Sequence, residues 1–455
     1  MSSRYDLTGL TDLAQRLIER ATARGADVAE VRAGQGWELE AKVRLGKPEL
    51  VQEAGHRSVA LRVLRDHCVA VTSTSDLSEA GLARLLDDSF ELLDLSQPDP
   101  LAGPVEPELL SKGPLPDLDL FDPQVDNIDA QRALEMATAA EQAALSFDPR
   151  LTLSEGASVS RVTGAAVLAL SSGFVGQTLG SYLSLVVSPV AEDEGGKRRR
   201  GFYWTARRHL SQLDDSVAVG QEAARRTLRQ LGPRKVETCE APVVFDPDAA
   251  RSIVGTFAGC LLGGAIWRRS SYLVEREGTV VASPLVTLID DPLIPRAPGS
   301  RAFDGEGVPS RRNLVVDQGN LKTFLLDSYA ARKLSKTTTA SAARGGGSVS
   351  ASTSNFSLQP GSQSREALLA STKRGLYVTE MMGQGFNPVT GDFSRGASGY
   401  WIENGELAFP VSEITISSNL DTMMKGIDAV ADDLDLKTST ASPTFRVATM
   451  TISGA

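Results

Sequence analysis

The sequence predicts an α+β protein of two domains, for three reasons. Amphipathic helices alternate with groups of strands through the first half of the chain, as in a layer of helices on a sheet. Near Glu237 the composition changes, and strand-rich sequence takes over. Asn404-Gly405 lies between two apolar runs there and favours a hairpin, because both central residues of a type I′ turn need positive φ. We expect an N-terminal α+β domain over residues 1–235 and a mainly antiparallel β domain over 236–455.

The N-terminal domain is expected to begin with a helix over residues 7–23, where Leu10, Leu13 and Leu17 lie on one stripe. A second helix is expected over about 77–94, because an N-cap residue and a following acid precede its apolar positions. The strands expected between these helices alternate apolar and polar residues, as half-buried strands do, and cover 26–33, 37–45, 58–64 and 69–72.

Residues 96–124 are rich in proline and acidic side chains, which predicts an extended connector rather than a packed element. The pattern of helices and strands then returns. Further helices are expected at about 128–145 and 216–231, and further strands within 150–190 and at 202–205.

The C-terminal domain is expected to contain one buried helix, over about 248–266, because this stretch is apolar on nearly every side and rich in glycine. Residues 335–354 consist almost entirely of serine, threonine, alanine and glycine, so we expect a flexible loop. The remaining expected elements are a helix at 364–374 and strands at 241–245, 279–289, 313–317, 321–326, within 375–420 and at 444–452.

Charge and composition exclude several classes of partner. The 455 residues carry a net charge of −10 without a concentrated basic face, so we expect no nucleic-acid partner. The longest apolar run, 253–267, is shorter than the roughly 20 residues that cross a bilayer, so we expect no membrane partner. No secretory signal is recognised, and the three cysteines are scattered. A cytoplasmic location is therefore expected.

Residue patterns alone reveal no catalytic constellation. The three histidines are scattered, so the spacing of a histidine-built zinc site is missing. Paired carboxylates at Asp290-Asp291 are suited to acid–base chemistry only when burial separates their pKa values, and solvated turns are the default for such pairs. We therefore assign no catalytic residue and no metal ligand from the residues themselves.

Three strings stand out in the C-terminal half: Ser283-Pro284-Leu285 followed by Asp290-Asp291, the stretch FDGEGVPSRRNLVVDQGNLKTF that opens 303–334, and VTEMMGQGFNPVTGDFSRGASGYW that opens 378–420. Together they resemble the TldD/PmbA family, and most closely its PmbA branch, also called TldE. The resemblance is specific over about 240–430 and looser before it. It implies an N-terminal α+β domain followed by a C-terminal domain built on a curved, barrel-like antiparallel sheet.

In the TldD branch, the resemblance implies a buried helix with an HExxxH motif and a later cysteine that completes a metal site for peptide hydrolysis. The matching helix here has Gly255, Thr256 and Cys260 at the motif positions, and no cysteine follows Cys260. Glycine and threonine supply neither a metal ligand nor a base. The resemblance thus implies a chain that has lost the metal site and has no catalytic residue, with zinc expected in a TldD-type partner.

The role implied by the resemblance is the non-catalytic subunit of a heterodimeric metalloprotease that cleaves unfolded peptides or peptide precursors. This chain would complete the peptide-binding chamber and stabilise the metal-bearing partner. Asp304, Glu306, Asp392 and Arg395 are our candidates for a peptide groove or partner interface.

Two alternatives stay open. One is a free-standing peptide-binding or scaffold homodimer without peptidase activity. The other is a hydrolase with relocated, carboxylate-based chemistry that uses Asp290, Asp291 or Asp304. An older family label, modulator of DNA gyrase, refers to an indirect effect and does not change the expectation that nucleic acid is no partner.

Overall fold

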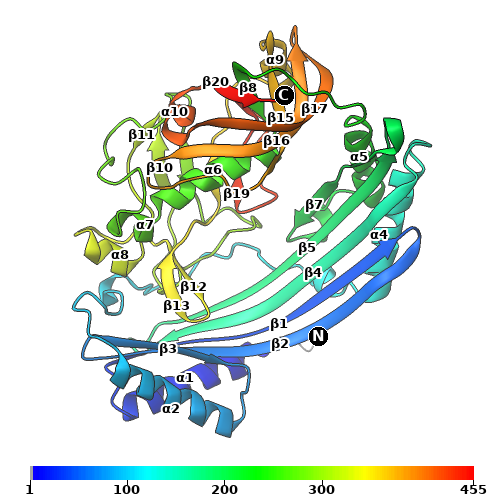
Figure 1. The fold of residues 1–455 in the computed structure, drawn as a ribbon. Helices are drawn as coiled ribbons and strands as arrows, with labels where there is room; N and C mark the ends of the chain where they lie inside the picture. The colour runs from blue at the N-terminus through cyan, green and yellow to red at the C-terminus, as the bar shows by residue number, and fades with distance from the viewer. Residues whose placement is uncertain (1–3, 455) are drawn as a thin grey trace.

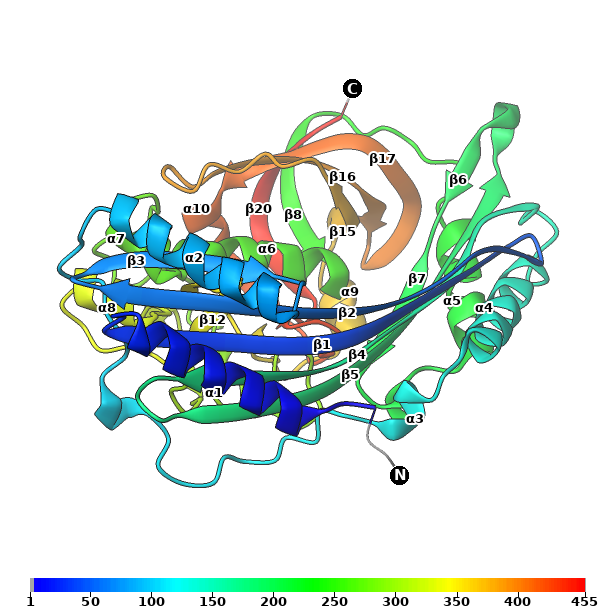
Figure 2. The same ribbon diagram turned by 90° about the horizontal axis from the view of Figure 1, so that it is seen from below.

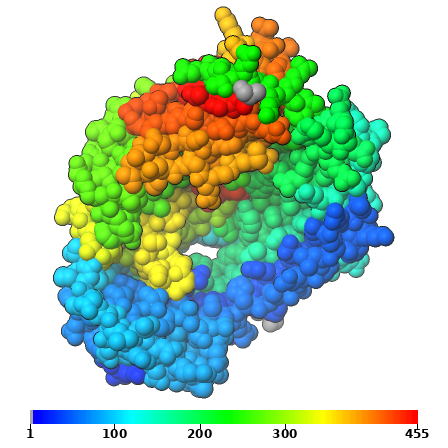
Figure 3. All heavy atoms as spheres, in the orientation of Figure 1, coloured from blue at the N-terminus to red at the C-terminus, as the bar shows by residue number. Residues whose placement is uncertain are grey.

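A computed structural model describes residues 4–454. A long curved sheet from the N-terminal half bends around a C-terminal domain, and the two parts enclose a central opening (Figures 1 and 3). The opening lies between the inner face of the sheet and the C-terminal domain, with one hairpin of that domain reaching across toward the sheet. No helix in residues 4–454 is long and apolar enough to cross a membrane.

The N-terminal sheet is antiparallel and has seven strands in the order β3-β2-β1-β4-β5-β6, with β7 also paired to β5. Its strands are β1 Val28–Arg44, β2 Lys47–Arg65, β3 Cys68–Thr74, β4 Leu153–Leu170, β5 Val175–Glu192, β6 Arg198–Arg200 and β7 Tyr203–Arg207. The two strands expected at 26–33 and 37–45 are one continuous strand, because the alternation runs on through Gly34 and Gly36. β1 pairs with β4, so one sheet unites both parts of the N-terminal half.

Four long helices cover one face of this sheet (Figure 2). α1 Leu7–Ala23 and α2 Glu79–Leu95 pack at one end, and α4 Ala130–Leu145 and α5 Ser216–Leu228 pack at the other. Val31 and Val43 of β1 belong to the two resulting cores. Since side chains alternate along a strand, the even-numbered residues of β1 face the central opening instead. The short elements of this half are η1 Pro107–Leu109, α3 Pro123–Asp126, η2 Glu194–Gly196 and η3 Leu210–Gln212.

The C-terminal domain is built on a closed ring of five strands, which confirms the barrel-like sheet. The ring runs β17-β16-β15-β8-β20 and closes where β17 pairs with β20; β8 and β15 are parallel, and the other pairs are antiparallel. The ring strands are β8 Cys239–Phe245, β15 Arg374–Met382, β16 Asp392–Glu403, β17 Glu406–Asn419 and β20 Phe445–Ser453, and β18 Ile427–Val430 extends β20 outside the ring.

A second, five-stranded sheet lies beside the ring, in the order β11-β10-β9-β14-β19. Its strands are β9 Leu288–Asp290, β10 Asn313–Asp317, β11 Asn320–Leu321, β14 Phe356–Leu358 and β19 Thr440–Ala441. The domain also contains α8 Ser328–Lys333, α9 Arg365–Ala370 and α10 Leu420–Lys425.

The single buried helix expected at 248–266 is two helices, α6 Pro247–Leu261 and α7 Gly263–Trp267. Leu262 is extended, with ψ of 136°, and forms a β-bridge with Leu325, which breaks the helix. α6 packs into the main C-terminal core through side chains such as Ile253 and Phe257. Its burial is one-sided, because Gly259 is exposed and its neighbours on that stripe are half-buried.

The flexible loop expected at 335–354 is corrected by the structure, since half of this segment forms a hairpin of β12 Ala342–Gly345 and β13 Ser348–Ala351. Thr338 and Thr339 before the hairpin are buried, and the hydroxyl of each donates to the carbonyl of Leu326 at 2.9 and 3.2 Å. Hydroxyl side chains thus satisfy the buried backbone where we expected solvent to do so.

Candidate functional site

The candidate site is the side of α6 that is not packed against the core. Asp246 caps this helix by accepting from the backbone N–H of Asp248 at 3.0 Å, and Pro247 occupies the first helical position. Four small residues follow at helical spacing along the open side: Ser252, Gly255, Thr256 and Gly259. A Cβ atom on Gly255 would meet only the Thr440 methyl, at 3.7 Å, so there is space above this stripe.

The three positions that match the metal motif do not form a ligand set. The Thr256 hydroxyl donates to the Ser252 carbonyl at 2.8 Å, inside its own helix. Cys260 is 1 % exposed, and burial raises the pKa of its thiol to about 11, although a hydrogen bond from Ser271 acts in the opposite direction. The thiol therefore stays protonated near neutral pH, whereas a metal ligand must be a thiolate. Together with Gly255, these residues do not fit zinc.

More widely, no group of three or more His, Cys, Asp or Glu side chains within residues 4–454 is placed to hold a metal ion. The stretch 435–440, where the resemblance implies a further ligand, is instead tied to the N-terminal sheet. Tyr182 donates to the Lys437 carbonyl at 2.8 Å, and Arg207 pairs with Asp435 at 2.9 Å. This segment thus bridges the two domains above the open side of α6.

Arg395 is the one groove candidate that contacts α6. Its guanidinium donates to the Ser252 hydroxyl at 2.9 Å, and burial lowers its pKa. Asp392 lies at an exposed turn of the ring, where its carboxylate accepts from the Thr390 hydroxyl at 2.6 Å. We infer that Asp392 shapes this turn, while Arg395 lines the site.

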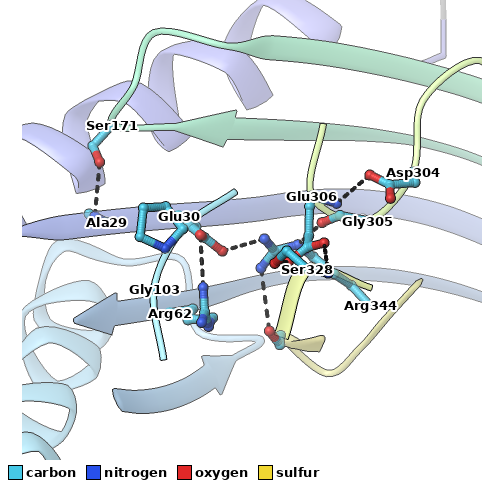
Figure 4. A network of polar contacts seen from close by, with 12 residues as sticks. Ala29, Glu30, Arg62, Gly103, Ser171, Asp304, Gly305, Glu306, Ser328 and Arg344 are labelled. Carbon is cyan, nitrogen blue, oxygen red and sulfur yellow. Dashed lines mark hydrogen bonds and ion pairs between the residues drawn. The ribbon is translucent and has the colours of Figure 1, made fainter. Parts of the chain in front are cut away.

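Asp304 and Glu306 lie far from this stripe, in a buried network beside the N-terminal sheet (Figure 4). The Asp304 carboxylate accepts three backbone N–H groups, from Glu306, Val308 and Ala342, at 2.9 to 3.1 Å. Burial raises the pKa of Asp304, and these three bonds oppose that shift. Asp304 therefore organises its own loop.

Glu306 accepts hydrogen bonds from the backbone N–H and the hydroxyl of Ser328. Burial, reinforced by repulsion from Asp304, raises the pKa of Glu306 to about 7. In the same network Arg344 reaches from the hairpin to the Gly305 carbonyl and to Glu30 of β1 (Figure 4). The contact between the domains is therefore made by Arg344 and Glu30, whereas Asp304 and Glu306 accept their hydrogen bonds from within the C-terminal domain.

The adjacent carboxylates of Asp290 and Asp291 accept hydrogen bonds from different segments. Asp290 is buried and accepts from the Ser354 N–H at 2.6 Å, and burial raises its pKa. Asp291 accepts from the Leu293 N–H at 2.9 Å. Each carboxylate thus fixes a loop.

Sequence reasoning missed a polar pocket of 180 Å³ between α5 and the ring, which Asp246, Arg226 and Tyr377 help to line. Burial raises the pKa of Asp246 although Arg226 lowers it, and the Tyr377 hydroxyl donates to its carboxylate at 2.9 Å. The Asp-Pro pair at 246–247 indicated a helix start, but nothing in the sequence placed α5 beside it.

The chain matches the PmbA/TldA metallopeptidase family in three segments: domain 1 at residues 29–93, the central domain at 123–231 and the C-terminal domain at 238–454. It is 34% identical to "Metalloprotease PmbA" of Escherichia coli O157:H7, over 98% of this chain and 96% of that protein. A TldD-branch relative, "Metalloprotease TldD homolog" of Haemophilus influenzae, is 28% identical over 69% of this chain and 67% of that protein.

The fold is also similar to a crystal structure from Bacteroides thetaiotaomicron, described as a candidate modulator of DNA gyrase. The TM-score is 0.91 at 28% sequence identity, over 98% of this chain and 99% of that one. The likeness therefore extends over both domains and the opening between them.

Proposed function

Since the chain belongs to the PmbA/TldD metallopeptidase family, in its PmbA branch, we propose that it is the non-catalytic subunit of a two-chain metallopeptidase. In this proposal it completes a chamber for unfolded peptides and stabilises a TldD-type partner, which holds the zinc. The observation that carries the proposal is the open side of α6. There the helix presents Ser252, Gly255, Thr256 and Gly259, which offer neither an imidazole nor a carboxylate.

Metal-assisted peptide hydrolysis needs ligands that fix the ion and a base that handles the proton of the attacking water. The small side chains of α6 supply neither, but they leave room for a substrate backbone to approach the helix. Arg395 and the bridging segment 435–440 flank this space with hydrogen-bond donors and acceptors. Such a surface suits holding a peptide better than cutting it.

Because the five-strand ring is closed, it leaves little free sheet edge in the C-terminal domain. The longest free edge is on β2, where residues 47–57 pair with β1 on one side, and pairing with β3 on the other side starts only at Val59. These residues are exposed. We propose that this edge contacts the partner chain, because unpaired main-chain groups readily accept another strand.

The proposal is tested by purifying this chain and its HExxxH paralogue from the same genome, alone and together. Cleavage of casein and of short unfolded peptides is then measured for each chain and for the mixture, with and without a chelator. We expect a stable complex and chelator-sensitive cleavage by the mixture, with none by this chain. Chelator-resistant cleavage by this chain alone would refute the proposal, and a homodimer with neither complex nor activity would favour the scaffold alternative.

A further inference from the structure

A basic pocket lies on the inner face of the N-terminal sheet, away from α6. It has a volume of 380 Å³ and lies between strands of the sheet and the loop around Ser300 of the C-terminal domain. A second hollow of 200 Å³ adjoins it and shares Arg32 and Arg301 as lining residues. Both are lined by residues of the N-terminal sheet and of the C-terminal domain.

The floor of the pocket is made of glycine backbone. Strand register places His56, Gly36, Gly164 and Gly180 in one row across β2, β1, β4 and β5. A Cβ on Gly36 would lie 2.5 Å from the His56 ring, and a Cβ on Gly180 would lie 3.2 Å from the Arg208 guanidinium. The glycines thus let both side chains lie flat on the sheet. Gly36 on β1 and Gly180 on β5 are two strand spacings apart, about 10 Å. The floor between the two side chains is therefore wide enough for an extended peptide.

Three arginines surround this floor without a carboxylate partner. Within residues 4–454, the Arg32 guanidinium makes no hydrogen bond or ion pair. Arg208 donates only to carbonyl groups, including that of Ala297 at 2.9 Å. Arg301 donates to the Ala342 carbonyl at 2.9 Å, while its Nε and one Nη are buried without a hydrogen-bond partner in the described chain.

The nearest carboxylates do not neutralise these charges. Asp304 and Asp290 attract Arg301, but neither lies within ion-pair distance of it in the described chain, and each is held by backbone N–H groups. Burial lowers the pKa of all three arginines, and Arg344 adds to this effect at Arg32. Clustered cations without counter-charges are costly, so an anion entering this pocket gains from all three.

We propose that the basic pocket binds a carboxylate of an extended peptide, either its C-terminal carboxylate or an acidic side chain. This inference rests on the proposed peptide-holding function and names the chemistry of the bound group. A guanidinium presents paired N–H donors that match the two oxygens of a carboxylate. The bare floor leaves room for the peptide main chain beside that contact.

Binding to the full chain is measured by fluorescence anisotropy with three labelled nine-residue peptides of glycine, serine and alanine. One has a free C-terminal carboxylate, one is amidated, and one is amidated with a single internal glutamate. Arg32→Gln is the test variant, because Arg32 supports no other contact. Arg16→Gln is the matched control, since Arg16 is also exposed but lies on α1, which covers the opposite face of the sheet.

We expect one or both carboxylate-bearing peptides to bind at least about ten-fold more tightly than the amidated one, as a charge-assisted hydrogen bond allows. Which of the two binds identifies the source of the carboxylate. Arg32→Gln should remove the difference, and Arg16→Gln should keep it. Arg301→Gln provides a second variant if the first changes the circular dichroism spectrum.

Equal binding of all three peptides, no binding of any, or a preference that survives both Arg32→Gln and Arg301→Gln would overturn the inference. Those outcomes are separate from the proposed function, which is judged by the cleavage assay of each chain and of the mixture with the HExxxH paralogue. If the mixture cleaves peptides but this chain shows no preference for a carboxylate, only the inference about the basic pocket is rejected, and the proposed function stands.

Discussion

Replacing Glu30 with glutamine should destabilise the protein strongly, because this carboxylate neutralises two buried arginines from different domains. Arg62 donates to Glu30 at 2.8 Å from β2, and Arg344 reaches it from the hairpin. The side chains of Glu30 and Arg344 are 5% and 3% exposed. Burial alone would raise the pKa of Glu30, but attraction to Arg344 and Arg62 outweighs it and holds the pKa below the ordinary value.

Removing one partner of a buried ion pair costs about 3 to 5 kcal/mol, because the remaining charge stays desolvated. Glu30→Gln leaves Arg62 and Arg344 unpaired, with Arg32 nearby as a third cation. Arg344→Met leaves Glu30 paired with Arg62 and should cost less, about 1 to 3 kcal/mol. Glu40→Gln is the control, since Glu40 is exposed on the same strand and should change stability by no more than about 0.5 kcal/mol.

The assay is urea unfolding followed by tryptophan fluorescence. With an m value of roughly 3 kcal/mol per molar, Glu30→Gln should lower the midpoint by about 1 to 2 M. Because the folded-state pKa is lowered, this stabilisation is present above the unfolded-state pKa, near 4.5, and is lost as the pH falls through the folded-state pKa. Equal effects of Glu30→Gln and Glu40→Gln, or a larger effect of Arg344→Met, would refute the reasoning.

Three further predictions concern single side chains. Glu306 has a folded-state pKa of about 7 against an ordinary 4.5, so stability should fall by about 3 kcal/mol as pH rises from 4.5 to 7, and Glu306→Gln should flatten that slope in urea unfolding. Gly399→Ala places a Cβ 1.9 Å from the Tyr377 carbonyl oxygen and should cost roughly 1 to 3 kcal/mol, whereas Gly345→Ala, which meets nothing within 4 Å, should be nearly neutral in thermal unfolding. The buried Cys260 thiol should react with Ellman's reagent only after unfolding, and a fast reaction lost in Cys260→Ala would contradict its burial.

The α+β class could be anticipated because helix periodicity and the turn at Asn404-Gly405 are local signals, whereas the barrel-like sheet was implied by the family resemblance. The continuity of β1 could not, because Gly34 and Gly36 look like a break unless the inner face of the sheet is known to hold a pocket. The hairpin at 342–351 was missed for a similar reason. Its low apolar content indicates flexibility, whereas the buried threonines before it are bonded to Leu326, a residue of a separate segment.

The same distinction between local signals and contacts between distant segments applies to the candidate site. Gly255, Thr256 and Cys260 could be located from the sequence because they lie on one helix. The pairing of Arg395 with Ser252 joins residues 143 positions apart, and the Arg32, Arg208 and Arg301 cluster joins three separate segments. Neither has a local pattern. Asp304 and Glu306 were predicted as groove or interface residues, and the structure places both in a buried hydrogen-bond network.

The closure of the five-strand ring also sets an order of events during synthesis. Phe245 on β8 lies opposite Phe445 on β20, with ring centroids 5.3 Å apart. About 200 residues separate the two strands, so at 5–20 residues per second the ribosome makes β20 some 10 to 40 s after β8. Through that interval the edge of β8 that pairs with β20 stays free, even after β15 has been made beside the other edge. A translational pause late in the chain would therefore prolong the exposure of an open sheet edge, and the nascent protein would depend on chaperones until its last step.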